Sequence, residues 1–178
     1  LVMASGVVGS NSHRKLDVEE FRGFALADNL APLVFINGAD SKAAQMFTLA
    51  HELAHLWLGE SGISDPEVGR LAEPGIERWC NAVAAEFLMT LALLRQDYQA
   101  GVPIAEEIQH LARRFKVSTL VALRRLFDAG FIDEPTLWQS YRDELARIRA
   151  LDQGDSGGGD FYRTLGARPR QRLAPAGP

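Results

Sequence analysis

The stretch from Ala43 to Leu58 constrains the fold of this chain more than any other segment. It contains neither glycine nor proline, Asp40 or Ser41 can cap its start, and Gly59 follows its end, so we predict a single helix. Apolar side chains recur around nearly the whole circumference of this helix, which predicts that it is buried. It contains His51-Glu-Leu-Ala-His55, and two buried histidines beside a carboxylate need polar partners.

The spacing within this motif suits a metal ion. His51 and His55 are about 40° apart around a helix that turns about 100° per residue, so both imidazoles can reach one ion. Glu52 is rotated about 100° from His51, where it can take a proton from a water molecule beside the ion. An ion with an open fourth position lowers the pKa of water to about 7. We predict a Zn²⁺ site, and Mn²⁺ is possible because histidine and carboxylate ligands accept both metals.

A third ligand has to come from a carboxylate further along the chain. Glu60 falls about 140° from His55 on the same helix, so it points away from the site. The downstream candidates are Asp65, Glu67, Glu73, Glu77 and Glu86.

The segment from Ile76 to Met89 is a second apolar helix and carries two of these candidates. Glu77 and Glu86 are nine residues apart and therefore face opposite sides. Glu77 lies on a mostly apolar stripe of this helix, where a buried carboxylate needs a polar partner. The geometry therefore favours Glu77 over Glu86 as the third metal ligand. On the same stripe we expect Cys80 to pack as a small apolar residue. Asn81 is either a hydrogen-bond partner of Glu77 or a cap for a neighbouring loop.

The remaining pattern predicts the fold class. Arg22–Ala27 and Leu33–Ile36 are short, apolar and β-prone, so we expect a hairpin or two neighbouring strands. From Ile104 to Ala150 the pattern is that of three further helices, with breaks near 116–118 and 130–133. The predicted fold is α+β and helix-dominated. It has a small antiparallel sheet packed on the motif helix and on a second ligand-bearing helix, followed by a helical, helix-turn-helix-like appendage.

We divide the chain into a zinc-binding core at 17–100, a helix-turn-helix-like helical appendage at 101–150 and a tail at 151–178. The residues before about position 17 show no clear pattern. The tail is rich in glycine and proline and poor in large apolar residues, so burial cannot offset the entropy of ordering it. We therefore expect the tail to be flexible.

Composition restricts the classes of protein that remain. The chain has 178 residues, of which 47% are hydrophobic and 24% charged, and this excludes a wholly disordered chain. The net charge of −4 provides no overall basic field for nucleic acid. Cys80 is the single cysteine and cannot form an internal disulfide, which favours a cytoplasmic location. The chain starts at Leu1 rather than at Met, so we expect a fragment of a longer protein.

Two sequence blocks together resemble the ImmA/IrrE metallopeptidase family. They are Val34-Phe-Ile-Asn37 with Phe47-Thr-Leu-Ala-His-Glu-Leu-Ala-His55, and Glu77-Arg-Trp-Cys-Asn81 leading into Ala84-Ala-Glu-Phe-Leu-Met89. The resemblance is close from about Arg22 to Met89 and continues more loosely to about Ala150. One departure is Thr90, where the family usually has proline; threonine can cap a helix that starts at Leu91.

The resemblance implies metal ligands at His51, His55 and Glu77, with Glu52 as the catalytic base. It implies a zinc-dependent metallo-endopeptidase that cleaves a regulatory protein, commonly an XRE-type transcriptional repressor, in transcription regulation and stress response. Many members of the family carry a DNA-binding domain on their N-terminal side. The start at Leu1 is consistent with the removal of such a domain.

The segment from Leu111 to Leu126 resembles a helix-turn-helix, with Ser118 as the cap of its second helix. Pro103–Gly130 contains five basic and three acidic residues, so its net charge is only +2. This is weak for binding a duplex, and we predict no direct nucleic-acid binding. The basic residues, Arg124 and Arg125 among them, are expected to serve folding or substrate docking. The alternative function is a DNA- or partner-binding transcriptional regulator with a structural or inactive zinc site.

Overall fold

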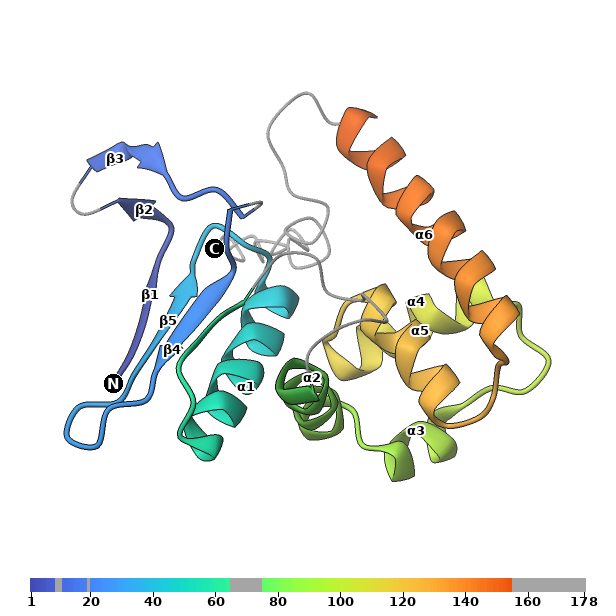
Figure 1. Cartoon of the computed structure of the whole chain (residues 1–178). Helices are drawn as coiled ribbons and strands as arrows, with labels where there is room; N and C mark the ends of the chain where they lie inside the picture. The colour runs from blue at the N-terminus through green and yellow to red at the C-terminus, as the bar shows by residue number, and fades with distance from the viewer. Residues whose placement is uncertain (9–10, 19, 65–74, 155–178) are drawn as a thin grey trace, which may run out of the picture.

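The computed structural model describes residues 1–8, 11–18, 20–64 and 75–154. The strands are β1 (Val2–Ser5), β2 (Val7–Val8), β3 (Asn11–Lys15), β4 (Gly23–Leu26), β5 (Leu33–Asn37) and β6 (Gly62–Ser64). The helices are α1 (Lys42–Leu58), α2 (Gly75–Leu88), α3 (Leu91–Asp97), α4 (Ile104–Phe115), α5 (Thr119–Asp128) and α6 (Glu134–Gly154). The prediction of a helix-dominated α+β fold is confirmed (Figure 1).

The larger sheet has the strand order β1-β5-β4-β6, and β2 and β3 form a separate pair. β4 and β5 are the predicted antiparallel neighbours, and β6 pairs antiparallel with β4. β1 pairs with β5 in parallel, with Val2 opposite Val34. The sheet is therefore mixed rather than wholly antiparallel, and it includes residues before position 17. The sequence pattern did not reveal β1 because this edge strand is largely exposed and has no apolar alternation.

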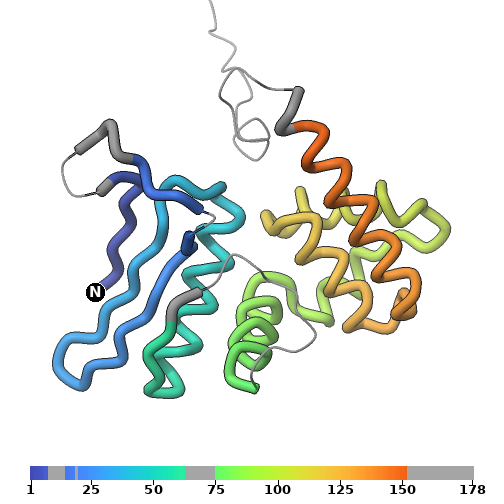
Figure 2. Tube along the Cα trace, turned by 45° about the horizontal axis from the view of Figure 1, so that its top comes forward, coloured from blue at the N-terminus to red at the C-terminus, as the bar shows by residue number. Residues whose placement is uncertain are grey.

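α1 lies between the sheet and α2, as two views of the chain show (Figures 1 and 2). The Ser41 hydroxyl accepts the N–H of Ala44 at 3.2 Å, and Gly59 ends the helix with a φ of 72°. The expectation that α1 is buried on nearly all sides is wrong, because Trp57 is 84% exposed and Leu53 is 44% exposed. The buried face contains Thr48, Ala50, His51, Glu52, Ala54 and His55. This face is where the sheet and α2 meet the helix.

α2 packs along α1 through a face of small residues that includes Cys80, Ala84 and Ala85. Small side chains at a helix–helix contact let the two backbones approach closely. After α2 the chain turns directly into α3. The Thr90 hydroxyl accepts the N–H of Leu93 at 3.3 Å and caps α3, as predicted for threonine at this position.

α3 to α6 pack around a second apolar core, on the far side of α2 from the sheet (Figure 1). Its fully or nearly fully buried members are Met89, Leu94, Ile108, Leu111, Ala112, Val117, Ala122, Leu123, Leu126 and Leu137. Ser118 caps α5 by accepting the N–H of Val121 at 3.2 Å, as predicted for the helix-turn-helix-like pair. α3 packs against α5, so in space it belongs with these helices. The boundary drawn from the sequence, between residues 100 and 101, places α3 in the core at 17–100 instead.

The last expected segment, 151–178, falls mostly outside the described residues. α6 continues through Leu151 to Gly154, so the tail begins later than expected, and residues 155–178 are not described. None of the helices in the described ranges is both long enough and apolar enough to cross a membrane.

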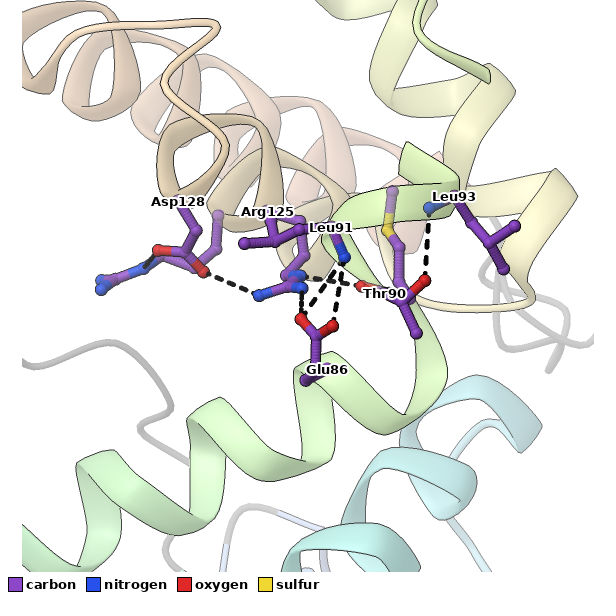
Figure 3. A network of polar contacts seen from close by, with 8 residues as sticks. Glu86, Thr90, Leu91, Leu93, Arg125 and Asp128 are labelled. Carbon is purple, nitrogen blue, oxygen red and sulfur yellow. Dashed lines mark hydrogen bonds and ion pairs between the residues drawn. The ribbon is translucent and has the colours of Figure 1, made fainter. Parts of the chain in front are cut away.

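A buried arginine connects α5 to α2 (Figure 3). The side chain of Arg125 is only 5% exposed, and its Nε donates to the carbonyl oxygen of Met89 at 2.9 Å. The guanidinium also pairs with Glu86 and with Asp128. Of the two expected roles, folding or substrate docking, the structure shows the first for Arg125, because its charge is used inside the fold. Arg124 lies on the exposed side of α5 and pairs with Asp128 at 3.0 Å.

Candidate metal centre

The structure brings together two histidine side chains from α1 and one glutamate carboxylate from α2. His51 Nε2 lies 3.2 Å from Glu77 Oε2, and His55 Nε2 lies 3.2 Å from Glu77 Oε1. The two Nε2 atoms are 3.0 Å apart. Among the described residues, these three form the group of possible metal ligands whose donor atoms all lie within 4.8 Å of one another. Both histidines are buried and Glu77 is about one-third exposed, so the group is reached from one side.

This donor set fits a metal ion. Ligand atoms held 2.0–2.1 Å from a tetrahedral zinc ion are about 3.3 Å from one another, close to the spacing seen here. Burial lowers the pKa of His51, and the neighbouring His55 lowers it further, whereas Glu77 and Asn81 act in the opposite direction. The net effect keeps His51 unprotonated, which is the form in which an imidazole binds a metal.

Asn81 fixes the ring of His51. The Asn81 Oδ1 and His51 Nδ1 atoms are 2.9 Å apart, so the amide oxygen can accept the Nδ1–H and leave Nε2 free as a ligand atom. From the sequence, Asn81 was expected to bond to Glu77 or to cap a loop. The structure shows a bond from Asn81 on α2 across to His51 on α1. The spacing of four residues from Glu77 could not reveal this bond, because it depends on how the two helices pack.

Glu52 is fully buried, and its Oε1 lies next to Gly23 of β4, so the carboxylate is on the side of α1 that faces the sheet. Cys80 is also fully buried, and burial raises the pKa of its thiol to about 11, with further contributions from Glu77 and Glu52. The thiol therefore lies within electrostatic range of both carboxylates and keeps its proton at neutral pH. These features match the interpretation of Cys80 as a packing residue.

The other candidate ligands are not at the site. Glu86 lies on the opposite side of α2, where its carboxylate pairs with Arg125 and accepts the N–H of Leu91 (Figure 3). Glu60 follows the end of α1 and is exposed. The three loop candidates, Asp65, Glu67 and Glu73, lie outside the described residues.

A His-Glu-x-x-His helix whose histidines meet a glutamate on the following helix defines a metallopeptidase-like site. The family model described as the IrrE N-terminal-like domain, a peptidase family, matches residues 10–127, well over half of the chain. The chain belongs to this metallopeptidase family.

Two relatives support the same assignment, and both are named radiation response metalloprotease IrrE. The protein of Deinococcus radiodurans is 35% identical over 99 residues, which cover 53% of this chain and 30% of the relative. The protein of Deinococcus deserti is 34% identical over 131 residues, which cover 71% of this chain and 44% of the relative. The chain thus spans less than half the length of these relatives.

Proposed function

We propose that this chain is a zinc-dependent metallo-endopeptidase with His51, His55 and Glu77 as metal ligands and Glu52 as the catalytic base. The observation that carries this proposal is the convergence of three donor atoms from α1 and α2, spaced 3.0–3.2 Å apart. Membership in a metallopeptidase family supports it. Manganese accepts the same ligands and is the second choice of metal.

The chain's own residues divide the work of peptide hydrolysis. When bound, the metal ion polarises the scissile carbonyl and makes water a better nucleophile at neutral pH. Glu52 then takes the proton of the attacking water and delivers it to the leaving amine. Asn81 keeps the ring of His51 in the orientation that points Nε2 at Glu77. The three proposed ligands lie on two packed helices, which hold them in this arrangement.

We propose a regulatory protein as the substrate, such as an XRE-type transcriptional repressor, cleaved in the cytoplasm during a stress response. The names of the two relatives refer to a radiation response, which supports a role in stress signalling. The exposed side of Glu77 leaves the centre open to a polypeptide.

The second candidate function is a DNA- or partner-binding regulator with an inactive zinc site. The helix-turn-helix-like pair α4 and α5 favours it. Against it, Arg125 lies inside the fold and cannot contribute to a basic surface that is already weak. We therefore favour the peptidase, with α3 to α6 as a structural or substrate-docking unit.

The Glu52→Gln variant tests the assigned chemistry. The amide is isosteric with the carboxylate but cannot act as a base, so we expect normal zinc content and loss of cleavage. Zinc is measured by mass spectrometry of the purified protein, and Glu60→Gln, on an exposed glutamate after the same helix, is the matched control. An empty Glu52→Gln protein would mean that Glu52 is a ligand and that the assignment of roles is wrong.

The substrate is sought by incubating the zinc-loaded chain with repressors encoded next to its gene and identifying fragments by mass spectrometry. The Glu52→Gln protein is run in parallel, so that contaminating proteases are recognised. We expect one discrete cleavage that only the unaltered chain produces. A gel-shift titration with promoter DNA tests the second candidate, and nanomolar, sequence-selective binding without any cleavage would favour the regulator.

A further inference from the structure

The rings of the two histidines are held in different ways. Asn81 tethers the ring of His51 through a hydrogen bond to Nδ1. The Nδ1 atom of His55 is buried and has no hydrogen-bond partner among the described residues. Nevertheless, the His55 ring points its Nε2 atom at Glu77 as closely as His51 does. Since no hydrogen bond to Nδ1 supports this orientation, packing against the ring has to support it from that side.

Gly62 of β6 provides that packing. A Cβ atom at this position would lie 3.0 Å from Cε1, 3.1 Å from Nδ1 and 3.3 Å from Nε2 of His55. Carbon atoms in proteins normally approach other heavy atoms no closer than about 3.5 Å. Glycine therefore lets the edge strand lie against this ring without strain. A side chain at position 62 requires the ring or the strand to move by a few tenths of an ångström.

Gly23 of β4 has the same relation to the neighbouring part of α1. A Cβ atom there would lie 2.5 Å from Thr48 Cγ2, 2.8 Å from the carbonyl oxygen of Phe35 and 3.3 Å from Glu52 Oε1. Thr48 is buried one turn before Glu52 on the same side of α1. The missing side chain of Gly23 thus lets the carboxylate of Glu52 pack directly against the strand.

Backbone conformation does not explain these two glycines. The described glycines that require a left-handed backbone are Gly59, Gly101 and Gly130. Gly23 and Gly62 lie in strands with ordinary φ values, which any residue can adopt. The space between the sheet and α1 is therefore what demands glycine at both positions.

The two positions lie on one face of the sheet, next to the motif. Gly62 pairs with Ala25, two residues from Gly23, and on paired strands such residues face the same side. On β5, further from β6, the same buried face carries the larger Val34 and Ile36. The smallest residues of this face therefore lie where Glu52 and His55 meet the sheet.

We propose that Gly62 and Gly23 are positioning residues of the metal centre, because their missing side chains let the sheet set the ring of His55 and the carboxylate of Glu52. This inference rests on the proposed function, which gives His55 and Glu52 their roles. The sheet is then part of the site, because it packs against the ring of His55 and the carboxylate of Glu52 on α1.

The Gly62→Ala variant tests the contact with His55. We expect its zinc affinity to fall about tenfold, the usual size of effect for a residue that orients a ligand. We also expect the ring resonances of His55 to shift in the metal-free protein, measured by NMR of labelled histidine. Gly75→Ala is the matched control, because no other side chain of the described residues lies within 4 Å of the Cβ position of Gly75, at the start of α2. Its zinc affinity and His55 resonances should equal those of the unaltered chain.

The Gly23→Ala variant tests the second contact. Glu52 is not a ligand in our assignment, so zinc affinity should stay within about threefold while the carboxyl ¹³C resonance of Glu52 shifts. Adding Thr48→Ser removes the atom nearest to the new Cβ and should partly restore that resonance. This pair also keeps the inference testable if Gly62→Ala does not fold, which a thermal unfolding curve would show.

The outcomes separate this inference from the proposed function. Unchanged zinc affinity and unchanged His55 resonances in Gly62→Ala would overturn the inference, with the metallopeptidase assignment intact. Failure of the unaltered chain to bind zinc would overturn the assignment instead. In that case the metal-free resonances still decide whether Gly62 sets the ring. An unchanged Glu52 carboxyl resonance in Gly23→Ala would exclude Gly23 from the proposed role.

Discussion

Glu77 and Glu86 are on one helix, but their carboxylates have different partners. Glu77 lies 3.2 Å from the Nε2 atoms of His51 and His55, whereas Glu86 pairs with Arg125. We expect Glu77→Ala to lose bound zinc, because only two ligands remain, and Glu86→Ala to keep it. Metal analysis after dialysis against limiting zinc distinguishes the two. An empty Glu86→Ala protein with a loaded Glu77→Ala protein would contradict the proposed ligand set.

The thiol of Cys80 has a pKa of about 11, raised first by burial and then by Glu77 and Glu52. We therefore expect a thiol reagent at pH 8 to label Cys80 only after denaturation. The raised pKa stabilises the folded state fully below pH 9.0, the value for a free thiol, and this stabilisation is lost as pH rises toward about 11.

The corresponding measurement is the free energy of unfolding of the metal-free chain in urea at pH 8 and at pH 10.5. It should fall between the two values, and the fall should be smaller in Cys80→Ala, which has no thiol to titrate. Rapid labelling of the folded chain at pH 8 would show that the thiol is not protected as described.

At the scale of elements, Arg125 joins α5 to the end of α2 (Figure 3). Arg125→Met keeps the length of the side chain but leaves the carbonyl of Met89 and the carboxylate of Glu86 without their donor. We expect the free energy of unfolding to fall by about 2–3 kcal/mol. Arg124→Met removes only a surface pair with Asp128, and its effect should be about 0.5 kcal/mol or less. Urea titrations of both variants test this, and equal effects would contradict the buried role of Arg125.

The position of each strand in the sheet also explains which strands could not be predicted from the sequence. β4 and β5 are central strands with alternating burial, and this alternation is visible in the sequence. β1 and β6 occupy the two edges of the sheet, where only one neighbour is present. Edge strands this short need no alternation of apolar and polar residues. They can therefore be recognised only from their backbone pairing with the neighbouring strand.

At the scale of the molecule, the metal centre and the second apolar core lie on opposite sides of α2 (Figures 1 and 2). Leu123 is fully buried in that second core. We expect Leu123→Ala to lower the free energy of unfolding by about 2–5 kcal/mol, through a cavity, while zinc affinity stays within about twofold. Calorimetric zinc titration of the folded variant measures this. A large loss of affinity would mean that the helical unit controls the geometry of the centre.

Zinc itself should stabilise the whole chain, because its proposed ligands come from both α1 and α2. At a free concentration one hundred times its dissociation constant, zinc adds about 2.7 kcal/mol to the free energy of unfolding. Chelation should remove this increment from the unaltered chain and leave Glu77→Ala unchanged, as thermal unfolding with and without chelator will show.

The sequence by itself determined the helix that carries the motif, its ends at Ser41 and Gly59, and the shared face of His51 and His55. These features depend on capping, on residue propensity and on helical period, all of which act between residues a few positions apart. For the same reason the opposite faces of Glu77 and Glu86 were predictable, and so was the cap at Ser118.

Only the tertiary structure decided which distant groups meet. It added the parallel strand β1, left Trp57 exposed and buried the guanidinium of Arg125. It brought the amide of Asn81 to the ring of His51. It also brought Gly62 against the ring of His55. Each of these depends on the distance between elements that are far apart in the sequence. Local propensity carries no information about that distance, because it is set by how side chains fill the space between packed layers.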